Sequence, residues 1–268
     1  MQKHATLGLY FESKSNLHQL DARLKVPAAF ALILLIGALP YGAWPVLLFV
    51  MFLVIGLQIA SEIPFSILYS RSLIVIPFML AAIPILFIAG GEPVFQVHII
   101  QKTWVITSNG ISHFGFILLK SWLSVQVAIL LAATTTMMSM LNALRVYHVP
   151  KILVLIFRLM WRYLSIMITK AQRMMRARAA RSVEGISSQT HSLKHLAWRA
   201  KGTGAMAGSL FVQSLEQSER VYTAMLSRGF DGELRLLPES PLTIKQNLVL
   251  SGWVIFCVFL FLLSITFG

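Results

Sequence analysis

The stretch KAQRMMRARAARS, Lys170 to Ser182, divides the chain into two kinds of sequence. It holds five Lys and Arg residues and no acid. The residues before it are dominated by apolar runs of membrane-spanning length, whereas most of those after it have the periodicity of surface helices. The stretch therefore lies where a membrane protein meets a partner, and the nature of that partner is the functional question.

Composition sets the class of the protein. Hydrophobic residues make up 57% of the 268 residues and charged residues only 12%, which is more apolar surface than one soluble core buries. We therefore predict an all-α integral membrane protein. The net charge of +13 fits topology signals and anionic headgroups better than nucleic acid, because the motifs of nucleic-acid-binding domains are missing. The single cysteine, Cys257, excludes an intrachain disulfide and a CxxC-type metal site.

Apolar runs predict about five transmembrane helices. The third run carries Pro77 and Pro84, which predict a kink packed against neighbouring helices. Between the third and fourth runs, Gly90–His113 reads as a weakly polar loop. Its His98 and His113 have no nearby third ligand, so we predict no metal site there. The five runs are Val26–Tyr41, Trp44–Ala60, Ser72–Ala89, Phe114–Leu141 and Asn247–Phe267.

Two further segments predict amphipathic helices. Pro150–Thr169 is apolar but carries Arg158 and Arg162 in its middle, which would cost about 5 to 7 kcal/mol at the bilayer centre. Polar side chains recur along it at helical spacing and continue into the basic stretch, so we expect a helix lying along the membrane or against the bundle. A second such helix is expected over Gly204–Arg228, ended by Gly229 in a left-handed conformation.

Charge asymmetry predicts the topology. Residues 142–246 carry sixteen Lys and Arg against six Asp and Glu, and the first 25 residues carry four Lys and Arg. By the positive-inside rule the N-terminus is expected in the cytoplasm and the C-terminus outside. The predicted domains are a cytoplasmic N-terminal segment (1–25), a four-span membrane region (26–141), a cytoplasmic or interfacial coupling domain (142–246) and a final transmembrane helix (247–268).

The arginines of the basic stretch suit an acidic partner surface. Arg173, Arg176, Arg178 and Arg181 lie around a helix among small residues that allow close approach, which are Ala177, Ala179, Ala180 and Ser182. A guanidinium can bind a carboxylate with two parallel hydrogen bonds. A solvated cytoplasmic face or a patch for lipid headgroups would use the same residues. The pattern by itself leaves the partner open.

Two triplets, Ala180-Arg181-Ser182 and Ser227-Arg228-Gly229, resemble the paired Ala-Arg-Gly-like signatures of a known family. The family is the transmembrane T component of energy-coupling factor (ECF) importers. Each triplet departs from the signature by one small residue. The run from Gly208 to Gly232, GSLFVQSLEQSERVYTAMLSRGFDG, and the segment Leu20–Lys25 are similar to the cobalt and nickel branch of that family.

The resemblance implies a mechanical role in the cytoplasmic (inner) membrane of a bacterium or archaeon. Members of this family couple two ABC ATPase subunits to a separate membrane-embedded substrate-binding S subunit. In this chain, Arg181 and Arg228 would anchor the two ATPases. The chain has no Gly-x-x-x-x-Gly-Lys-[Ser/Thr] loop, so ATP and magnesium belong to the partner subunits. No catalytic residue, cofactor or metal site is expected in this chain. The resemblance favours cobalt or nickel as cargo, with a vitamin such as biotin as the alternative.

A polytopic membrane enzyme acting on lipid-linked phosphates is the competing class. Such an enzyme needs acids for a metal or a general base. Glu216 with Glu219, and His191 with His195, are spaced to share a helix face and hold a cation. Pairs of this kind are common on solvated helices, so we assign them no catalytic role.

Overall fold

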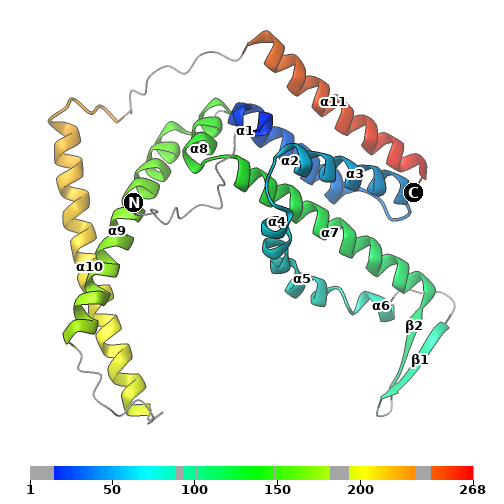
Figure 1. The fold of residues 1–268 in the computed structure, drawn as a ribbon, viewed down its shortest axis with the longest axis horizontal. Helices are drawn as coiled ribbons and strands as arrows, with labels where there is room; N and C mark the ends of the chain where they lie inside the picture. Colours follow the sequence, from blue (N-terminus) through cyan, green and yellow to red (C-terminus); the bar gives the residue numbers. More distant parts are fainter. Residues whose placement is uncertain are drawn as a thin grey trace. The chain divides into compact units, whose positions relative to one another are not determined.

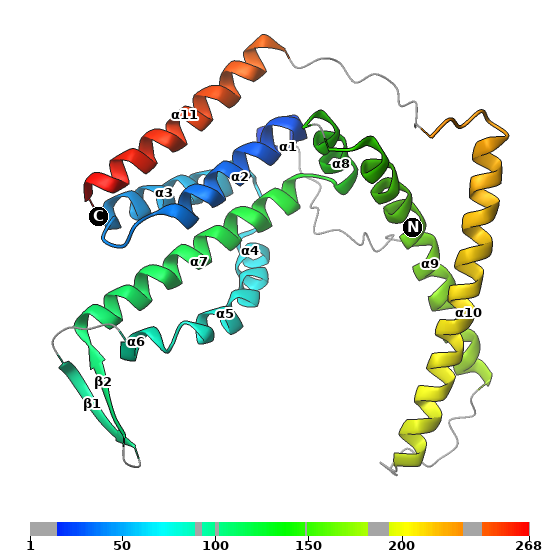
Figure 2. The same ribbon diagram turned by 180° about the vertical axis from the view of Figure 1, so that it is seen from behind.

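The computed structural model is almost wholly helical over the residues that it describes, which are 15–88, 93–99, 102–147, 149–181, 193–232 and 243–267. The chain divides into two compact units, residues 1–146 with 239–268 and residues 147–238. Figures 1 and 2 show the elements from opposite sides. In chain order these are α1 (Asn16–Gln19), α2 (Ala22–Ala38), α3 (Trp44–Ala60), α4 (Phe65–Ser72), the 3-10 helix η1 (Leu73–Val75), α5 (Ile76–Ala81), α6 (Ile85–Ile88), β1 (Pro93–Ile99), β2 (Lys102–Thr107), α7 (Ser108–Thr134), α8 (Met137–Val146), α9 (Lys151–Arg181), α10 (Leu193–Leu226) and α11 (Ile244–Phe267).

The core of the first unit lies among α2, α3, α7 and α11. Leu32, Ile36, Leu47 and Leu123 are at most 2% exposed and pack in one apolar cluster. From α11 the indole Nε1 of Trp253 donates to the carbonyl of Ala28 in α2, at 3.1 Å. Both views show α11 running alongside α2 and α3. In a bilayer such helices are held by van der Waals packing and interhelical hydrogen bonds rather than by the hydrophobic effect.

Two polar side chains link helices inside this unit. Gln58 of α3 donates through Nε2 to Oε1 of Gln126 in α7, at 3.1 Å, and both residues are essentially fully buried. Lys120 of α7 donates through Nζ to the carbonyl of Leu39, at 2.9 Å, where α2 ends. The last carbonyls of a helix lack partners within the helix, so this lysine satisfies one of them.

The third apolar run, Ser72–Ala89, is not the continuous helix that its composition predicts. Proline has no N–H, so Pro84 cannot donate to Leu80, and α5 ends at Ala81. A turn follows, in which Ile85 N donates to the carbonyl of Ala82 at 3.1 Å, and the short α6 begins. The prolines therefore break the run where we predicted a kink.

The prediction of a loop over Gly90–His113 is also wrong for the residues of this range that the structure describes. Strands β1 and β2 form an antiparallel hairpin with Ile99 opposite Lys102, and a bulge lies between Pro93 and Phe95. Helix α7 then begins at Ser108 and ends at Thr134, so the predicted fourth span is shifted toward the N-terminus. Thr135, at the end of α7, has extended backbone geometry, which separates α7 from α8.

The outer surface of α11 confirms the membrane class. Apolar residues on it are more than half exposed, which suits hydrocarbon and not water. Among the described residues, α7, α9 and α11 are the helices long and apolar enough to cross a membrane by length and composition. Helix α9 qualifies although Arg158 and Arg162 lie in it. The exposed residues of α11 are Leu248, Val249, Ile255, Val258, Phe259, Leu262 and Ile265.

The second unit consists of the two long helices α9 and α10. Helix α9 is unbroken from Lys151 into the basic stretch, as its polar periodicity predicts. Helix α10 begins at Leu193, earlier than the predicted start at Gly204. Glycine lowers helix propensity by only about 1 kcal/mol, so Gly202 and Gly204 do not prevent the helix from extending through them.

Candidate functional site

The first triplet lies at the end of α9. Ala180 and Arg181 are the last two residues of that helix, and both are exposed. Ser182 lies outside the described residues. Arg178 and Arg181 occupy the last helical turn, where positive side chains interact favourably with the negative end of the helix dipole. The triplet therefore presents a cation at a helix end.

The second triplet forms the turn that ends α10. Gly229 has φ +76°, the left-handed conformation that the sequence predicts for it. Its N–H donates to the carbonyl of Leu226 at 2.9 Å, and the N–H of Phe230 donates to the carbonyl of Met225 at 3.1 Å. This pair of bonds is the Schellman motif, which places Arg228 at the helix cap. The prediction that Gly229 caps the helix is confirmed.

Contacts between α9 and α10 show that the two helices are antiparallel. Arg178, near the end of α9, donates through Nη1 to Thr203 Oγ1 at 3.2 Å, in the first part of α10. Gly202 permits this contact, because a Cβ there would lie 2.6 Å from Nη2 of Arg178. At the other end of the pair, residues of α9 line a groove together with Arg228.

The antiparallel packing separates the two triplets. Arg162 lines the groove beside Arg228 and lies nineteen residues before Arg181, a helical rise of about 28 Å. Arg181 and Arg228 thus lie near opposite ends of one helix pair. The spacing in the sequence shows only that they belong to different helices.

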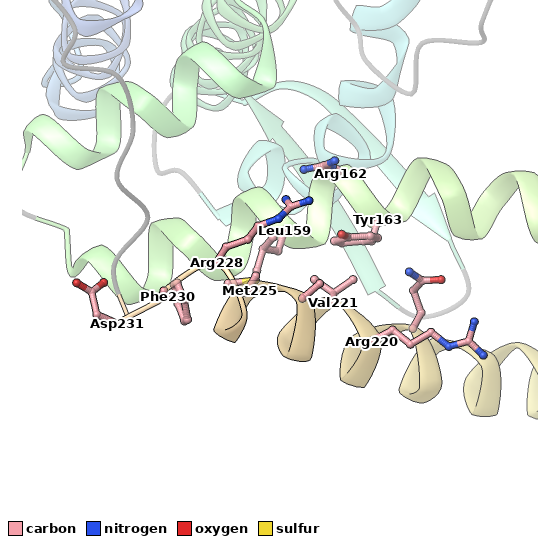
Figure 3. A pocket seen from close by; sticks show the side chains of 12 residues that line it. Leu159, Arg162, Tyr163, Arg220, Val221, Met225, Arg228, Phe230 and Asp231 are labelled. Atoms are coloured by element: carbon pink, nitrogen blue, oxygen red, sulfur yellow. The ribbon is translucent and has the colours of Figure 1, made fainter.

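The groove has a volume of about 560 Å³. Figure 3 shows Arg162 and Arg228 extending on the same side of it, with Leu159, Met225 and Val221 between the helices. Of the residues that line the groove, the predicted site includes only Arg228 and Gly229. Arg162 entered the sequence argument only as a charge to be kept out of the bilayer. The groove is lined by Leu159, Arg162, Tyr163, Gln217, Arg220, Val221, Ala224, Met225, Arg228, Gly229, Phe230 and Asp231.

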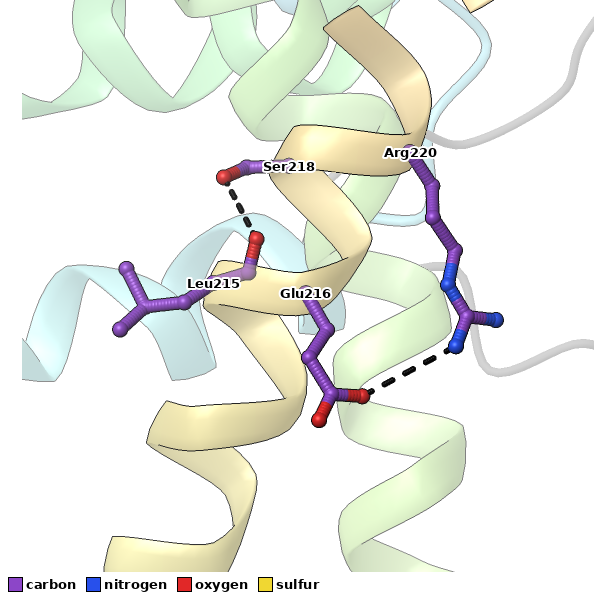
Figure 4. Close-up of polar contacts among 4 residues, drawn as sticks. All are labelled: Leu215, Glu216, Ser218 and Arg220. Atoms are coloured by element: carbon purple, nitrogen blue, oxygen red, sulfur yellow. Dashed lines mark hydrogen bonds and ion pairs between the residues drawn. The ribbon is translucent and has the colours of Figure 1, made fainter. Parts of the chain in front are cut away.

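Most of the side chains considered for a cation or metal site contact other residues or lie outside the described residues. Glu216 pairs with Arg220 one turn later on α10, at 3.9 Å, and both side chains are exposed (Figure 4). In the first unit, His113 stacks on Tyr41 with ring centroids 3.3 Å apart. His191 and the side chain of His195 lie outside the described residues. No group of three or more metal-ligating side chains occurs among those described.

Comparison with known proteins identifies the family. The family model of CbiQ, cobalt transport protein, matches residues 13–238. An uncharacterized protein of Methanocaldococcus jannaschii is 26% identical over 91% of this chain and 82% of its own length. The energy-coupling factor transporter transmembrane protein EcfT of Streptococcus equi is 27% identical over 96% of both chains. The EcfT protein of Bacillus subtilis is 25% identical over 87% of both chains.

The family match covers both long helices and most of the first unit. It confirms the resemblance that the two triplets carry in the sequence. The chain therefore belongs to the CbiQ family and is a transmembrane T component of an energy-coupling factor transporter.

Proposed function

We propose that this T component transmits the ATP-driven motion of two ABC ATPase subunits to a separate substrate-binding S subunit, through Arg181 and Arg228. The T component is itself non-catalytic, and ATP is hydrolysed by the partner ATPases. The observation that supports the proposal is the placement of two exposed arginines near opposite ends of the antiparallel pair α9 and α10. One rigid helix pair then offers two separate anchors, one for each ATPase.

The local geometry suits this mechanical role. Arg228 follows the last turn of α10 and is held by the two hydrogen bonds of the Schellman motif. Arg181 ends a helix of 31 residues. A guanidinium at a fixed helix end binds a carboxylate with two parallel hydrogen bonds, so movement of the acidic partner is passed to the helix. Movement of either ATPase would thereby turn or shift α9 and α10.

Apolar side chains on α10 suggest where the S subunit docks. Phe211, Leu215, Tyr222 and Leu226 recur at helical spacing and are 49% to 64% exposed. A stripe of this kind marks an interaction surface. We assign it to the S subunit, because the two arginines already account for the ATPases.

The family favours cobalt or nickel as the cargo of the assembled transporter, since its description is a cobalt transport protein. A vitamin such as biotin is the alternative. The test measures uptake of labelled cobalt, nickel and biotin by cells that express this chain with its partner transporter subunits. The compound that is taken up identifies the cargo. Uptake of biotin without either metal would contradict the metal assignment.

Substitution of the two arginines tests the coupling. Truncating one member of a desolvated charge pair costs about 2 to 5 kcal/mol, so Arg181→Ala and Arg228→Ala should each reduce uptake and weaken retention of the ATPases. The double variant should abolish uptake, and the control Arg199→Ala, outside both triplets, should change little. Arg→Lys should rescue only partly, because lysine lacks the planar fork. Normal uptake and normal ATPase co-purification in the double variant would refute the proposal.

Single cysteines test the five-span topology, which we propose with the N-terminus in the cytoplasm and the C-terminus outside. In a Cys257→Ala background, cysteines at Ser108 and after Gly268 should react with a membrane-impermeant maleimide added to intact cells. A cysteine at the exposed Ser218 of α10 should react only after permeabilisation. Labelling of Ser218 and the C-terminus from the same side would show that the span count is wrong.

A further inference from the structure

We propose that Lys25 clamps the corner between α7 and α8, so that movement of α9 is passed into the first unit. The proposal rests on the function proposed above. It gives a role to the segment Leu20–Lys25, which resembles the family but contains neither arginine triplet. Helix α8 ends at Val146, and the second unit begins at the next residue. Along the chain, α9 is therefore joined to the first unit through α8 and this corner.

The corner consists of Thr134, Thr135 and Thr136. Helix α7 ends at Thr134, Thr135 has φ −131° and ψ 128°, and α8 begins at Met137. The hydroxyl of Thr136 accepts from the N–H of Ser139 at 3.3 Å and so caps α8. The hydroxyl of Thr135 is buried and has no hydrogen-bond partner within the described part of the chain. A buried polar group of this kind disfavours the arrangement, so contacts from outside the corner must hold it.

Lys25 supplies such contacts. Its Nζ donates to the carbonyl of Thr134 and to the carbonyl of His18, at 3.2 Å in each case. The carbonyl of Thr134 is among the last of α7, which have no partner within the helix. A positive side chain there also interacts favourably with the negative end of the α7 dipole. One half-buried ammonium group therefore joins the end of α7 to α1.

The start of α2 positions Lys25. The carboxylate of Asp21 accepts from the backbone N–H two residues later, at 3.1 Å, and so caps α2. In the first turns of α2, Ala22 and Val26 pack with Ala143 of α8, which is fully buried. Both views show these first turns beside α8 (Figures 1 and 2). The same short segment thus contacts both sides of the corner, α7 through Lys25 and α8 through its apolar side chains.

The first measurement uses the purified full chain alone, in detergent. Lys25→Met removes the ammonium group and keeps a long side chain. We expect the amides of Ser139 and Met140, in the first turn of α8, to exchange with deuterium at least about tenfold faster, because loss of charge-assisted hydrogen bonds opens the corner. Lys120 likewise donates to a helix-end carbonyl, that of Leu39, so Lys120→Met is the matched control and should leave both amides unchanged. Unchanged exchange in Lys25→Met would overturn the proposal.

The second measurement uses the complex with its ATPases and S subunit in liposomes. It takes the ratio of uptake to ATP hydrolysed, for whichever of labelled cobalt, nickel and biotin the parent complex transports. Lys25→Met should lower this ratio several-fold while the ATPases still co-purify, because movement of α9 would bend a loosened corner instead of moving the first unit. Lys25→Arg, which keeps the charge and the donors, should restore most of the ratio. An equal fall for Lys120→Met would overturn the proposal in favour of a general loss of stability.

A second variant opens the corner while Lys25 is kept. Ala143→Leu adds volume where α8 packs against α2, so it should speed exchange and lower the ratio while circular dichroism shows unchanged helix content. A normal ratio together with faster exchange in both variants would overturn the link between the corner and transport. The function proposed above is tested separately by Arg181→Ala and Arg228→Ala, through loss of the ATPases, which Lys25→Met should retain. Normal transport by that double variant would refute the role of the triplets, whereas the exchange measurement decides the role of Lys25 without ATPases.

Discussion

Replacement of Gln58 and Gln126 by leucine, singly and together, measures how strongly α3 and α7 are held by their buried amide pair. The pair makes one hydrogen bond of 3.1 Å, between Nε2 of Gln58 and Oε1 of Gln126. The two remaining amide atoms, Oε1 of Gln58 and Nε2 of Gln126, are buried without a partner. Leucine has a similar volume, so the substitutions change polarity more than packing.

Each single variant loses the hydrogen bond and leaves the remaining amide wholly unpaired. The cost of such a group is about 1 to 3 kcal/mol. The double variant removes all four polar atoms, so its free energy of unfolding should equal or exceed that of the parent. Two single losses of about 1 to 3 kcal/mol against a neutral double variant correspond to a coupling energy of at least about 2 kcal/mol, which exceeds the average of about 0.6 kcal/mol for interhelical hydrogen bonds in membrane proteins.

Reversible unfolding of the full chain in mixed micelles, titrated with dodecyl sulfate and followed by circular dichroism, gives the free energies. The control cycle combines Gln58→Leu with Gln213→Leu in α10, a residue of the other unit, where the effects should add. Additive effects for Gln58→Leu and Gln126→Leu would mean that the two amides do not act as a pair. The reasoning would then be wrong.

Four further substitutions test the geometry of single positions. Gly229→Ala should destabilise the end of α10 by about 1 to 2 kcal/mol, because an L side chain is strained at positive φ, and faster amide exchange there should show it. Gly110→Ala places a Cβ 2.6 Å from the backbone carbonyl oxygen of Leu86 and should cost about 1 to 3 kcal/mol in unfolding free energy. Gly115→Ala, whose Cβ meets nothing nearer than 3.9 Å, should instead stabilise α7 by about 0.5 to 1 kcal/mol. Lys120→Met should lower stability in the same micelle assay by about 1 to 2 kcal/mol, because the carbonyl that Lys120 reaches loses its charged donor; unchanged stability would show that the bond contributes nothing.

The elements predicted best are those whose signals are local. Apolar run length was enough to place α2, α3 and α11, and the helical period of polar residues was enough to continue α9 through the basic stretch. Gly229 could be assigned as a helix cap because positive φ is a property of one residue and its neighbours. The two triplets were located by resemblance, and their coupling role stays a prediction.

The predictions that failed concern the third apolar run and the segment that follows it. Composition favours one long helix over Ser72–Ala89, but Pro77 and Pro84 remove donors that this helix needs, and the chain forms short helices instead. In the next segment, β1 and β2 pair residue by residue as an antiparallel hairpin, because each strand finds a partner in the other. Strand pairing depends on two segments at once, and neither segment shows it alone.

By itself, the sequence determined that this is a helical membrane protein, that a basic helix follows its apolar runs, and that two arginine triplets mark its family. Composition, period and short motifs are sufficient for this, because each is a property of neighbouring residues. Only the tertiary structure decided that α9 and α10 are antiparallel, that Arg181 and Arg228 therefore lie near opposite ends of the pair, and that Arg162 joins Arg228 across a groove. These facts rest on contacts between residues far apart in the sequence, such as Arg178 and Thr203, which are 25 positions apart. Helix packing sets such pairs, and the sequence pattern does not encode them.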